Sequence, residues 1–556
     1  MSRMIWSAVR TCVIVAMLYL GRLDFASAQD LGALGEAEPV TVSGTLSVQG
    51  THYHSSLGNA TGRPDATGYL SFNPTVSIYG VQFPFSVYLT TSEATFRQPF
   101  NEFGVSPRYK AITAHLGYRS VQYSRYTLGY QRWLGAGLDV QTGMLRASGM
   151  YGRFQAATEE DAERRLPGIY RRMGMAFKLG IGSEQDFLDV QFLRGWDDSS
   201  SIGTRSMGLT PTAAENTVVG VAGRYGLLEN RLQFDAEVAG SAFTRDISSR
   251  ELPSSDVPGF VRGLMRANLS TRFNLAMRGA VSYRAQDYRI TVQYERIEPD
   301  YQSMGVGYSA GDREDITIMP SVSLLRTLRF NSSIGIRRNN LMNDRATTTR
   351  RLLLSFGGSW QASEALGLAA QYTNYSTNTD DGRVRVTDSI RVENVSQMIS
   401  VGPRFTFGEG RDRASVSLNA THQRYDDRNL LTNALNNTES TTGMGSYNGV
   451  LAEYSLNASA SYGVTRSSAF SNTMMMVSLG GGRNFFDEAL MVNVLLSFSR
   501  VQSALTTDSQ IFPAITLTYR LSDNDVFTFN SRVSHNARTN DPYTEIMSSA
   551  GYSRTF

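Results

Sequence analysis

The chain has 556 residues, with 53 basic and 50 acidic side chains and a single cysteine. This nearly balanced charge gives no basic surface for nucleic acid, so we expect no nucleic-acid partner. One cysteine cannot build a disulfide framework or a cysteine-based metal site.

Residues 1–28 have the three regions of an export signal. Arg3 and Arg10 are basic, residues 11–21 form an apolar run, and Ala26 to Ala28 offer small residues for cleavage. The run is shorter than the roughly 20 residues of a membrane-spanning helix. We therefore predict cleavage before Gln29, a short periplasmic segment over 29–39, and one barrel domain over 40–556.

Period-two alternation dominates the rest of the chain. In 288–295, "YRITVQYE" alternates apolar and polar residues, and the same pattern recurs in 232–238, 414–420 and 490–498. Alternation of this kind predicts half-buried β-strands. With their flanks, these segments reach the length of about nine to eleven residues that a tilted strand needs to cross a bilayer.

The connections between these segments come in two sizes. Residues 408–412, 484–488 and 521–525 form tight turns, whereas 196–216 and 246–258 form long polar loops. Short periplasmic turns, long extracellular loops and aromatic girdles are typical of outer-membrane barrels. We predict an all-β transmembrane antiparallel barrel of about 24 strands, within a range of 22 to 26 and with an even number. Residues 298–326 and 426–471 do not fit the up-and-down strand order cleanly.

Residues 72–154 are more distinctive. They include Gln98 to Asn101, Ser106-Pro107, Tyr109-Lys110 and His115 to Arg119. This stretch resembles the N-terminal third of an uncharacterised family of large outer-membrane barrels from Bacteroidota and related bacteria. The resemblance implies the fold and the compartment, and it assigns no activity and no functional residues.

The last residues resemble the signal by which outer-membrane barrels are recognised for assembly. Ser549, Gly551, Tyr552 and Phe556 fit its spacing, whereas Arg554 occupies a place that is usually apolar. We therefore expect the barrel-assembly machinery as a partner, together with outer-membrane lipid and lipopolysaccharide.

Residues 95–133 interrupt the alternation with prolines and closely spaced tyrosine, arginine and glutamine. A barrel of about 24 strands is wider than a porin and would leak unless something occupied it. We predict two alternatives: the stretch folds into the lumen, or it forms irregular strands and an external loop. The candidate constriction residues are Arg97, Gln98, Asn101, Arg108, Lys110 and Arg119.

Little in the sequence points to other chemistry. His52 and His54 share one strand face but lack a third metal ligand, so we expect no metal site and no cofactor. No Gly-x-Ser-x-Gly signature marks a nucleophile, so we expect no enzyme, with an outer-membrane hydrolase as the least favoured alternative. Residues 158–165 carry i,i+4 charge pairs and predict a short helix.

Two functional classes stay open. The first is a conduit, either porin-like or an export channel, for solutes or polymers. The second is a docking barrel that holds a periplasmic or surface protein. A plugged receptor, which is a gated conduit, would carry more than about 100 residues before its barrel, but the strands here begin near Val40.

Overall fold

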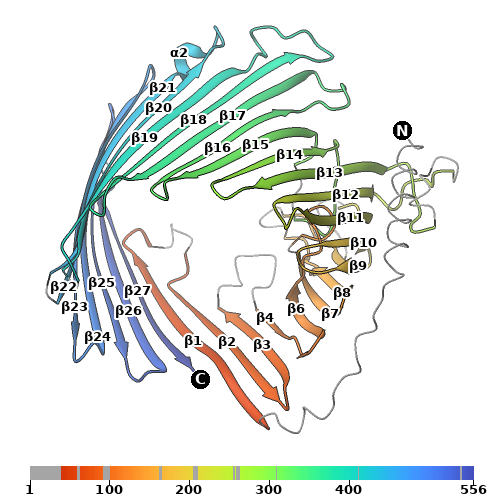
Figure 1. Ribbon diagram of the computed structural model, residues 1–556, viewed down its shortest axis with the longest axis horizontal. Helices are drawn as coiled ribbons and strands as arrows, with labels where there is room; N and C mark the ends of the chain where they lie inside the picture. The colour runs from red at the N-terminus through yellow and green to blue at the C-terminus, as the bar shows by residue number, and fades with distance from the viewer. Residues whose placement is uncertain are drawn as a thin grey trace.

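The protein forms one continuous antiparallel sheet that closes on itself (Figure 1). Period-two apolar alternation gives each strand one face for lipid and one for the interior, and closure leaves no unpaired strand edge. The structure, a computed structural model, describes residues 39–58, 63–91, 101–129, 131–161, 166–203, 211–253, 257, 263–307, 310–410, 412–451, 453–538 and 541–556.

The first half of the sheet runs from β1 to β14. Its strands are β1 Val40–Ser55, β2 Ala66–Ile78, β3 Val81–Thr90, β4 Glu102–Val105, β5 Arg108–Tyr109, β6 Ile112–Ser120, β7 Arg132–Thr142, β8 Leu145–Gln155, β9 Arg171–Gly182, β10 Phe187–Asp198, β11 Glu215–Leu227, β12 Leu232–Thr244, β13 Thr271–Arg284 and β14 Tyr288–Ile297.

The second half runs from β15 to β27 and includes one short helix. Its elements are β15 Arg313–Leu324, β16 Leu328–Arg338, β17 Thr347–Gln361, β18 Leu366–Asp381, β19 Glu393–Phe407, β20 Ala414–Asp427, α2 Asn433–Asn436, β21 Thr438–Leu451, β22 Tyr454–Ser467, β23 Ser471–Phe485, β24 Leu490–Gln502, β25 Thr507–Arg520, β26 Asp525–Ala537 and β27 Tyr543–Thr555.

β4 and β5 are two halves of one interrupted strand. Both pair with β3 on one side and with β6 on the other. The break falls at Ser106 and Pro107, where proline cannot donate a ladder hydrogen bond. The 27 segments therefore make 26 barrel strands. This even number lies at the upper end of the expected range and two above the central estimate of 24.

The barrel closes where β27 meets β1 (Figure 1). The pairing runs from Thr45 opposite Thr555 to Ser55 opposite Glu545. Beyond β27, Phe556 exchanges two backbone hydrogen bonds with Gly44, at 2.8 and 3.0 Å. Its ring lies 6.2 Å from that of Phe72. Phe556 therefore completes the seam of the sheet.

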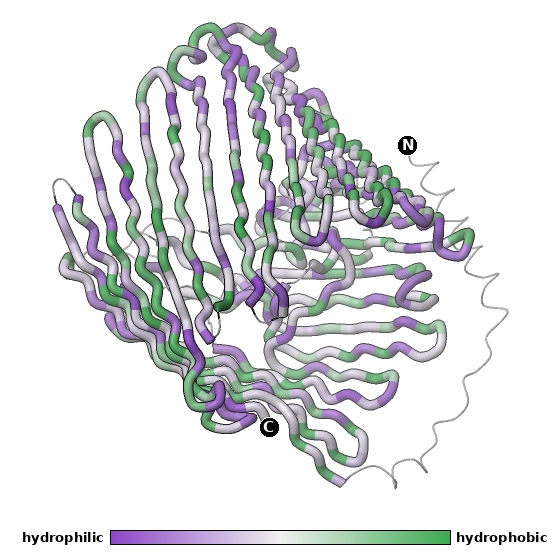
Figure 2. The backbone as a smooth tube through the Cα atoms, turned by 60° about the vertical axis from the view of Figure 1, so that its left-hand side comes forward, coloured by the Kyte–Doolittle hydropathy of each residue, from purple (hydrophilic) through white to green (hydrophobic). Residues whose placement is uncertain are grey.

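The two faces of the wall differ in chemistry, as the alternating hydropathy in Figure 2 shows. On β14, Ile290 and Val292 are exposed on the outer face, while Gln293 and Glu295 lie on the inner face. The same alternation places exposed apolar side chains on the outside of β1, β10, β16 and β24. An apolar exterior around a polar interior is the arrangement of a membrane barrel.

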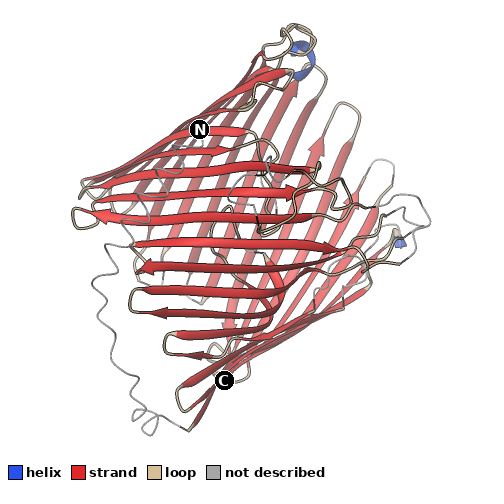
Figure 3. Ribbon diagram, turned by 90° about the vertical axis from the view of Figure 1, so that its right-hand side faces the viewer, coloured by secondary structure: helices blue, strands red, loops and turns tan. Residues whose placement is uncertain are grey.

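Connections of two kinds lie at opposite ends of the tilted strands (Figure 3). One end, here called the turn end, carries tight turns such as Tyr79-Gly80 and residues 486–489. Several turn residues have positive φ, including Lys110 at 50° and Gly143 at 54°. The other, the loop end, carries the longest connections. The predicted asymmetry of turns and loops is confirmed, and such turns are periplasmic in outer-membrane barrels.

The predicted helix over 158–165 is wrong for the residues that the structure describes. Thr158 and Ile169 form an antiparallel bridge, and so do Asp161 and Leu166. Thr158 and Asp161 therefore take part in β-type backbone pairing in place of helical hydrogen bonds. Among the described residues, no helix is long and apolar enough to span a membrane. The predicted export signal at 1–28 lies outside the described residues.

Candidate functional site

The structure describes four of the six predicted constriction residues. Arg97 and Gln98 lie outside the described residues. Asn101 accepts a hydrogen bond from the Thr90 backbone at 2.7 Å. Arg108 lies on β5 opposite Gln82, and Lys110 lies in a turn with its Nζ 5.4 Å from the Tyr109 ring centroid. The constriction assigned to these residues stays a prediction.

Arg119 belongs to a polar network on the inner wall. Its guanidinium donates to Ser106 Oγ at 2.6 Å and to Ser86 Oγ at 2.5 Å. Ser106 Oγ lies 2.9 Å from His115 Nδ1, and His115 Nε2 lies 2.7 Å from Asp139 Oδ2. The network links β3, the break between β4 and β5, β6 and β7, so it braces the interrupted strand.

A serine, a histidine and an aspartate stand here in the order that hydrolases use. However, Ser106 faces Nδ1 of the ring instead of Nε2, and it also accepts a hydrogen bond from Arg119. Asp139 accepts a further hydrogen bond from Ser148. These contacts describe a wall network, and the absence of enzyme activity stays a prediction.

Residues 121–129, here called loop A, connect β6 to β7 and lie against the inner wall. The Tyr126 hydroxyl donates to Glu295 Oε1 at 2.5 Å, and the Tyr126 backbone donates to Glu237 Oε1 at 2.9 Å. Glu237 on β12 and Glu295 on β14 both belong to inner faces. Loop A thus crosses from β6 to strands more than 100 residues further along the chain.

Residues 298–307, here called loop B, follow β14 and also fold inward. The Met304 backbone donates to Asn216 Oδ1 at 2.9 Å, and Asn216 Nδ2 donates to Ser241 Oγ at 2.9 Å. Ser241 Oγ in turn donates to the Gln302 carbonyl at 2.5 Å. Asn216 is fully buried, so β11 and β12 hold loop B through satisfied polar contacts.

The two loops are joined to each other. Gly129 donates to the Gly305 carbonyl at 2.9 Å, and Ser303 Oγ donates to the Thr127 carbonyl at 2.7 Å. The Tyr301 hydroxyl donates to the Tyr126 carbonyl at 3.0 Å. Loops A and B therefore form one hydrogen-bonded unit against the inner wall.

Inner-face glycines make room for this unit. A Cβ on Gly220 would lie 2.5 Å from Thr127 Oγ1, and one on Gly195 would lie 2.9 Å from Met304 Sδ. A larger side chain at either position would push a loop away from the wall. Below loop A, Trp133 and Phe154 pack edge to face, with ring centroids 4.4 Å apart.

Two parts of the wall differ in how their inner faces are covered. The covered sector, β7 to β15, carries the main buried cluster with loops A and B. This cluster comprises Tyr126, Leu128, Trp133, Met150, Phe154, Ala176, Leu193, Ala214, Val218, Ala239, Ala276, Ile297, Tyr301 and Met304. The open sector, β16 to β27 with β1 to β3, exposes inner-face side chains: Tyr375 46%, Met444 46%, Met474 48%, Met491 40%, Val501 41% and Met547 45%.

Burial changes the acidity of the tyrosines in the loops. Burial raises the pKa of Tyr126 above its ordinary value, and the hydrogen bond to the Glu295 carboxylate raises it further. Burial also raises the pKa of Tyr301. Both hydroxyls thus stay protonated, and act as donors, well into the alkaline range.

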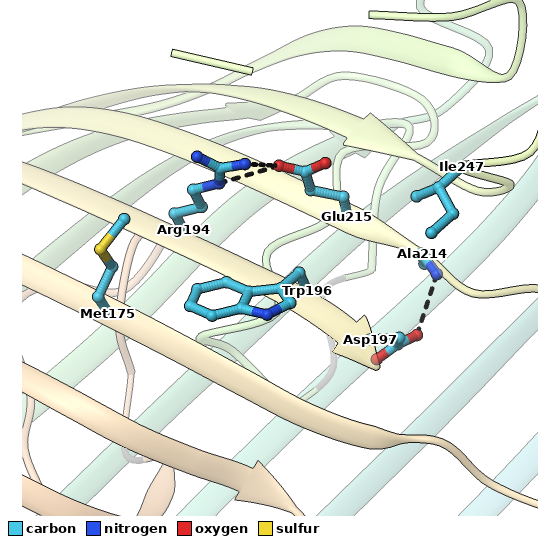
Figure 4. A pocket seen from close by; sticks show the side chains of 7 residues that line it. All are labelled: Met175, Arg194, Trp196, Asp197, Ala214, Glu215 and Ile247. Carbon is cyan, nitrogen blue, oxygen red and sulfur yellow. Dashed lines mark hydrogen bonds and ion pairs between the residues drawn. The ribbon is translucent and has the colours of Figure 1, made fainter. Parts of the chain in front are cut away.

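A recess of about 340 Å³ lies near the loop end of β9, β10 and β11 (Figure 4). Arg194 Nε donates to Glu215 Oε1 at 2.9 Å, and Asp197 accepts from the Ala214 backbone at 3.1 Å. Asp197 also pairs with Arg172 at 2.7 Å. Every charged group that lines this recess already has a partner, so it offers no free group for a ligand.

The histidines that could have held a metal lie on the outer face of β1. His52 Nδ1 lies 3.0 Å from the Asp65 carbonyl. In the part of the chain that the structure describes, no three side chains of the metal-ligating types cluster together.

Loop B and its contacts were not predicted. Its only sequence signal was the failure of 298–326 to fit the up-and-down order. Glu237 and Glu295 look like ordinary polar residues of alternating strands, so nothing local marks them as loop anchors.

Comparisons with known proteins identify no family for this chain. No family model and no curated protein matches the chain. Three solved barrels are similar in structure. The P pilus usher (PapC) translocation pore has 11% identity and a TM-score of 0.34, covering 93% of this chain and 99% of its own. The Pseudomonas aeruginosa siderophore receptor PirA has 10% identity and a TM-score of 0.40, covering 93% of this chain and 80% of its own. Acinetobacter baumannii OccAB2 has 10% identity and a TM-score of 0.30, covering 62% of this chain and 92% of its own.

Proposed function

We propose that this protein is a conduit in the bacterial outer membrane, reached by export and removal of residues 1–28. The observation that carries the proposal is the open sector, where inner-face side chains such as Tyr375 and Met474 are exposed. A barrel of 26 strands is wider than a porin of about 16 to 18 strands, which already leaves an aqueous channel. Loops A and B would narrow such a channel from one side.

The resemblance of 72–154 to barrels of Bacteroidota supports this compartment. Lipopolysaccharide would contact the apolar exterior, and the barrel-assembly machinery would insert the sheet.

The test is single-channel recording of the purified protein in a planar bilayer. We expect a large and stable conductance. Folding is checked in the same sample by gel migration before and after boiling, since a closed barrel migrates differently until it is unfolded. Folded protein without conductance would contradict the conduit and favour the docking barrel.

The predicted constriction at 95–133 has its own test. Shortening residues 97–106 should raise conductance if that segment narrows the lumen. An unchanged conductance would remove the segment from the constriction and leave loops A and B as the narrowing elements.

A further inference from the structure

A basic recess of about 250 Å³ lies at the turn end of β11 to β14. It is lined by Arg224, Arg231, Gln233, Ser282, Arg284 and Arg289, among others. By strand register, Arg224, Gln233, Ser282, Arg284 and Arg289 belong to the inner face. The recess therefore lies at one mouth of the lumen.

Two of its arginines stand directly opposite each other. Arg284 on β13 and Arg289 on β14 are cross-strand partners, and like charges in that position destabilise a sheet. Arg231 is brought to the same place, because its carbonyl accepts the Arg284 backbone N–H at 2.7 Å. Three positive charges thus meet at one corner of the recess.

Most inner-face arginines of this sector have carboxylate partners. Arg278 Nη1 lies 2.7 Å from Asp235 Oδ1, and Arg224 Nη2 lies 3.1 Å from Asp235 Oδ2. Arg231, Arg284 and Arg289 differ, since no ion pair involves them within the described residues. The nearby Asp186 carboxylate accepts the Gly226 backbone N–H at 2.7 Å. The described residues that line the recess thus include four arginines and no carboxylate.

We infer that this corner binds an oxyanion, the phosphate or carboxylate of a solute that passes through the lumen. Guanidinium groups match both anions with paired hydrogen bonds. A bound anion would also relieve the repulsion between Arg284 and Arg289. The inference rests on the proposed conduit for the source of the solute, and it extends that function to a charge class.

The test is calorimetric titration of the full chain in detergent with pyrophosphate and, separately, with succinate. Moderate salt, about 0.15 M, screens exposed charges beyond about 8 Å and so suppresses nonspecific attraction. We expect binding with one site per chain. Stronger binding of pyrophosphate would identify a phosphorylated solute, and stronger binding of succinate a carboxylated one; either supports the site.

The double variant Arg284→Gln/Arg289→Gln should weaken binding by about tenfold or more, because hydrogen bonds to charged groups are lost. The matched control is Arg404→Gln/Arg532→Gln, which removes the same charge from inner-face positions on β19 and β26. It should bind like the wild type. Arg284→Lys/Arg289→Lys, which keeps the charge but not the fork, should bind with intermediate strength.

Absence of binding by the wild type, or equal binding by the Arg284→Gln/Arg289→Gln variant, would overturn the inference. Titration in detergent does not require an open lumen. Binding without conductance would therefore count against the conduit and leave the anion site standing. Conductance without binding would count against the anion site and leave the conduit standing.

Discussion

The covered and open sectors share one hydrogen-bonded sheet but are stabilised differently. In the covered sector, Trp133 and Leu193 are fully buried beneath loops A and B. In the open sector, Tyr375 and Met474 face the interior with nearly half of their surface exposed. Strand pairing and ion pairs such as Arg350–Asp380 hold the open sector, whereas the covered sector also has a packed core. One side of the barrel thus has a packed inner layer, and the other side leaves inner-face side chains exposed.

The seam tests how much the open sector depends on pairing. Deleting Phe556 removes two backbone hydrogen bonds to Gly44 and the ring contact with Phe72. No inward loop braces this junction among the described residues. We expect the largest effect here, with most of the assembled protein lost from the outer membrane and periplasmic degradation products in its place.

Outer-membrane yield by quantitative immunoblot checks this expectation. Arg554→Tyr is the control, because it changes the same strand while it restores the usual apolar place, and its yield should be neutral or improved. Equal yields for the wild type and the deletion would show that pairing between β1 and β27 closes the seam without Phe556.

Trp133→Ala compares the two sectors directly. Trp133 is fully buried against Phe154, so its loss should lower the free energy of unfolding by about 3–5 kcal/mol. Tyr375→Ala in the open sector should change it by less than about 0.5 kcal/mol. Urea unfolding of both variants in the same detergent measures the difference. Similar losses would erase the distinction between sectors.

Gly220→Val asks whether loop A narrows the lumen. Its Cβ would lie 2.5 Å from Thr127 Oγ1, and overpacking of this kind costs about 1–3 kcal/mol. We expect a displaced loop A and a higher single-channel conductance. Gly443→Ala is the control, since nothing lies within 4 Å of the added Cβ. A conductance that Gly220→Val leaves unchanged would separate loop A from the pore.

The smallest expected effect is on pH dependence. Because burial raises the folded-state pKa of Tyr126, its contribution to stability is complete below the unfolded value of 10.0 and falls as pH rises above it. Conductance should therefore be constant from pH 7 to about 10 and increase beyond that as loop A loosens. Tyr126→Phe, which has no hydroxyl to ionise, should lack this alkaline step. An identical step in that variant would assign it to other groups.

Much of the wall follows from sequence, because alternation reports directly on a strand with one apolar and one polar face. Residues 232–238 and 490–498 were predicted as strands and lie within β12 and β24. The strand count was low by two, since boundaries in 298–326 and 426–471 gave no clean parity. The anchors of the loops could not be found this way: Asn216 and Glu295 meet loops that are distant in sequence, and only tertiary packing brings them together.

The contacts of loop A also constrain the order of assembly. The hydrogen bond from Tyr126 to Glu295 spans 169 residues, and that from Tyr301 to the Tyr126 carbonyl spans 175. Closing such long intervals is entropically costly until the intervening strands are already aligned. Loop A therefore cannot settle before β14 joins the growing sheet. The space beside Gly220 that receives Thr127 stays empty until then, so the packed core of the covered sector forms late in assembly.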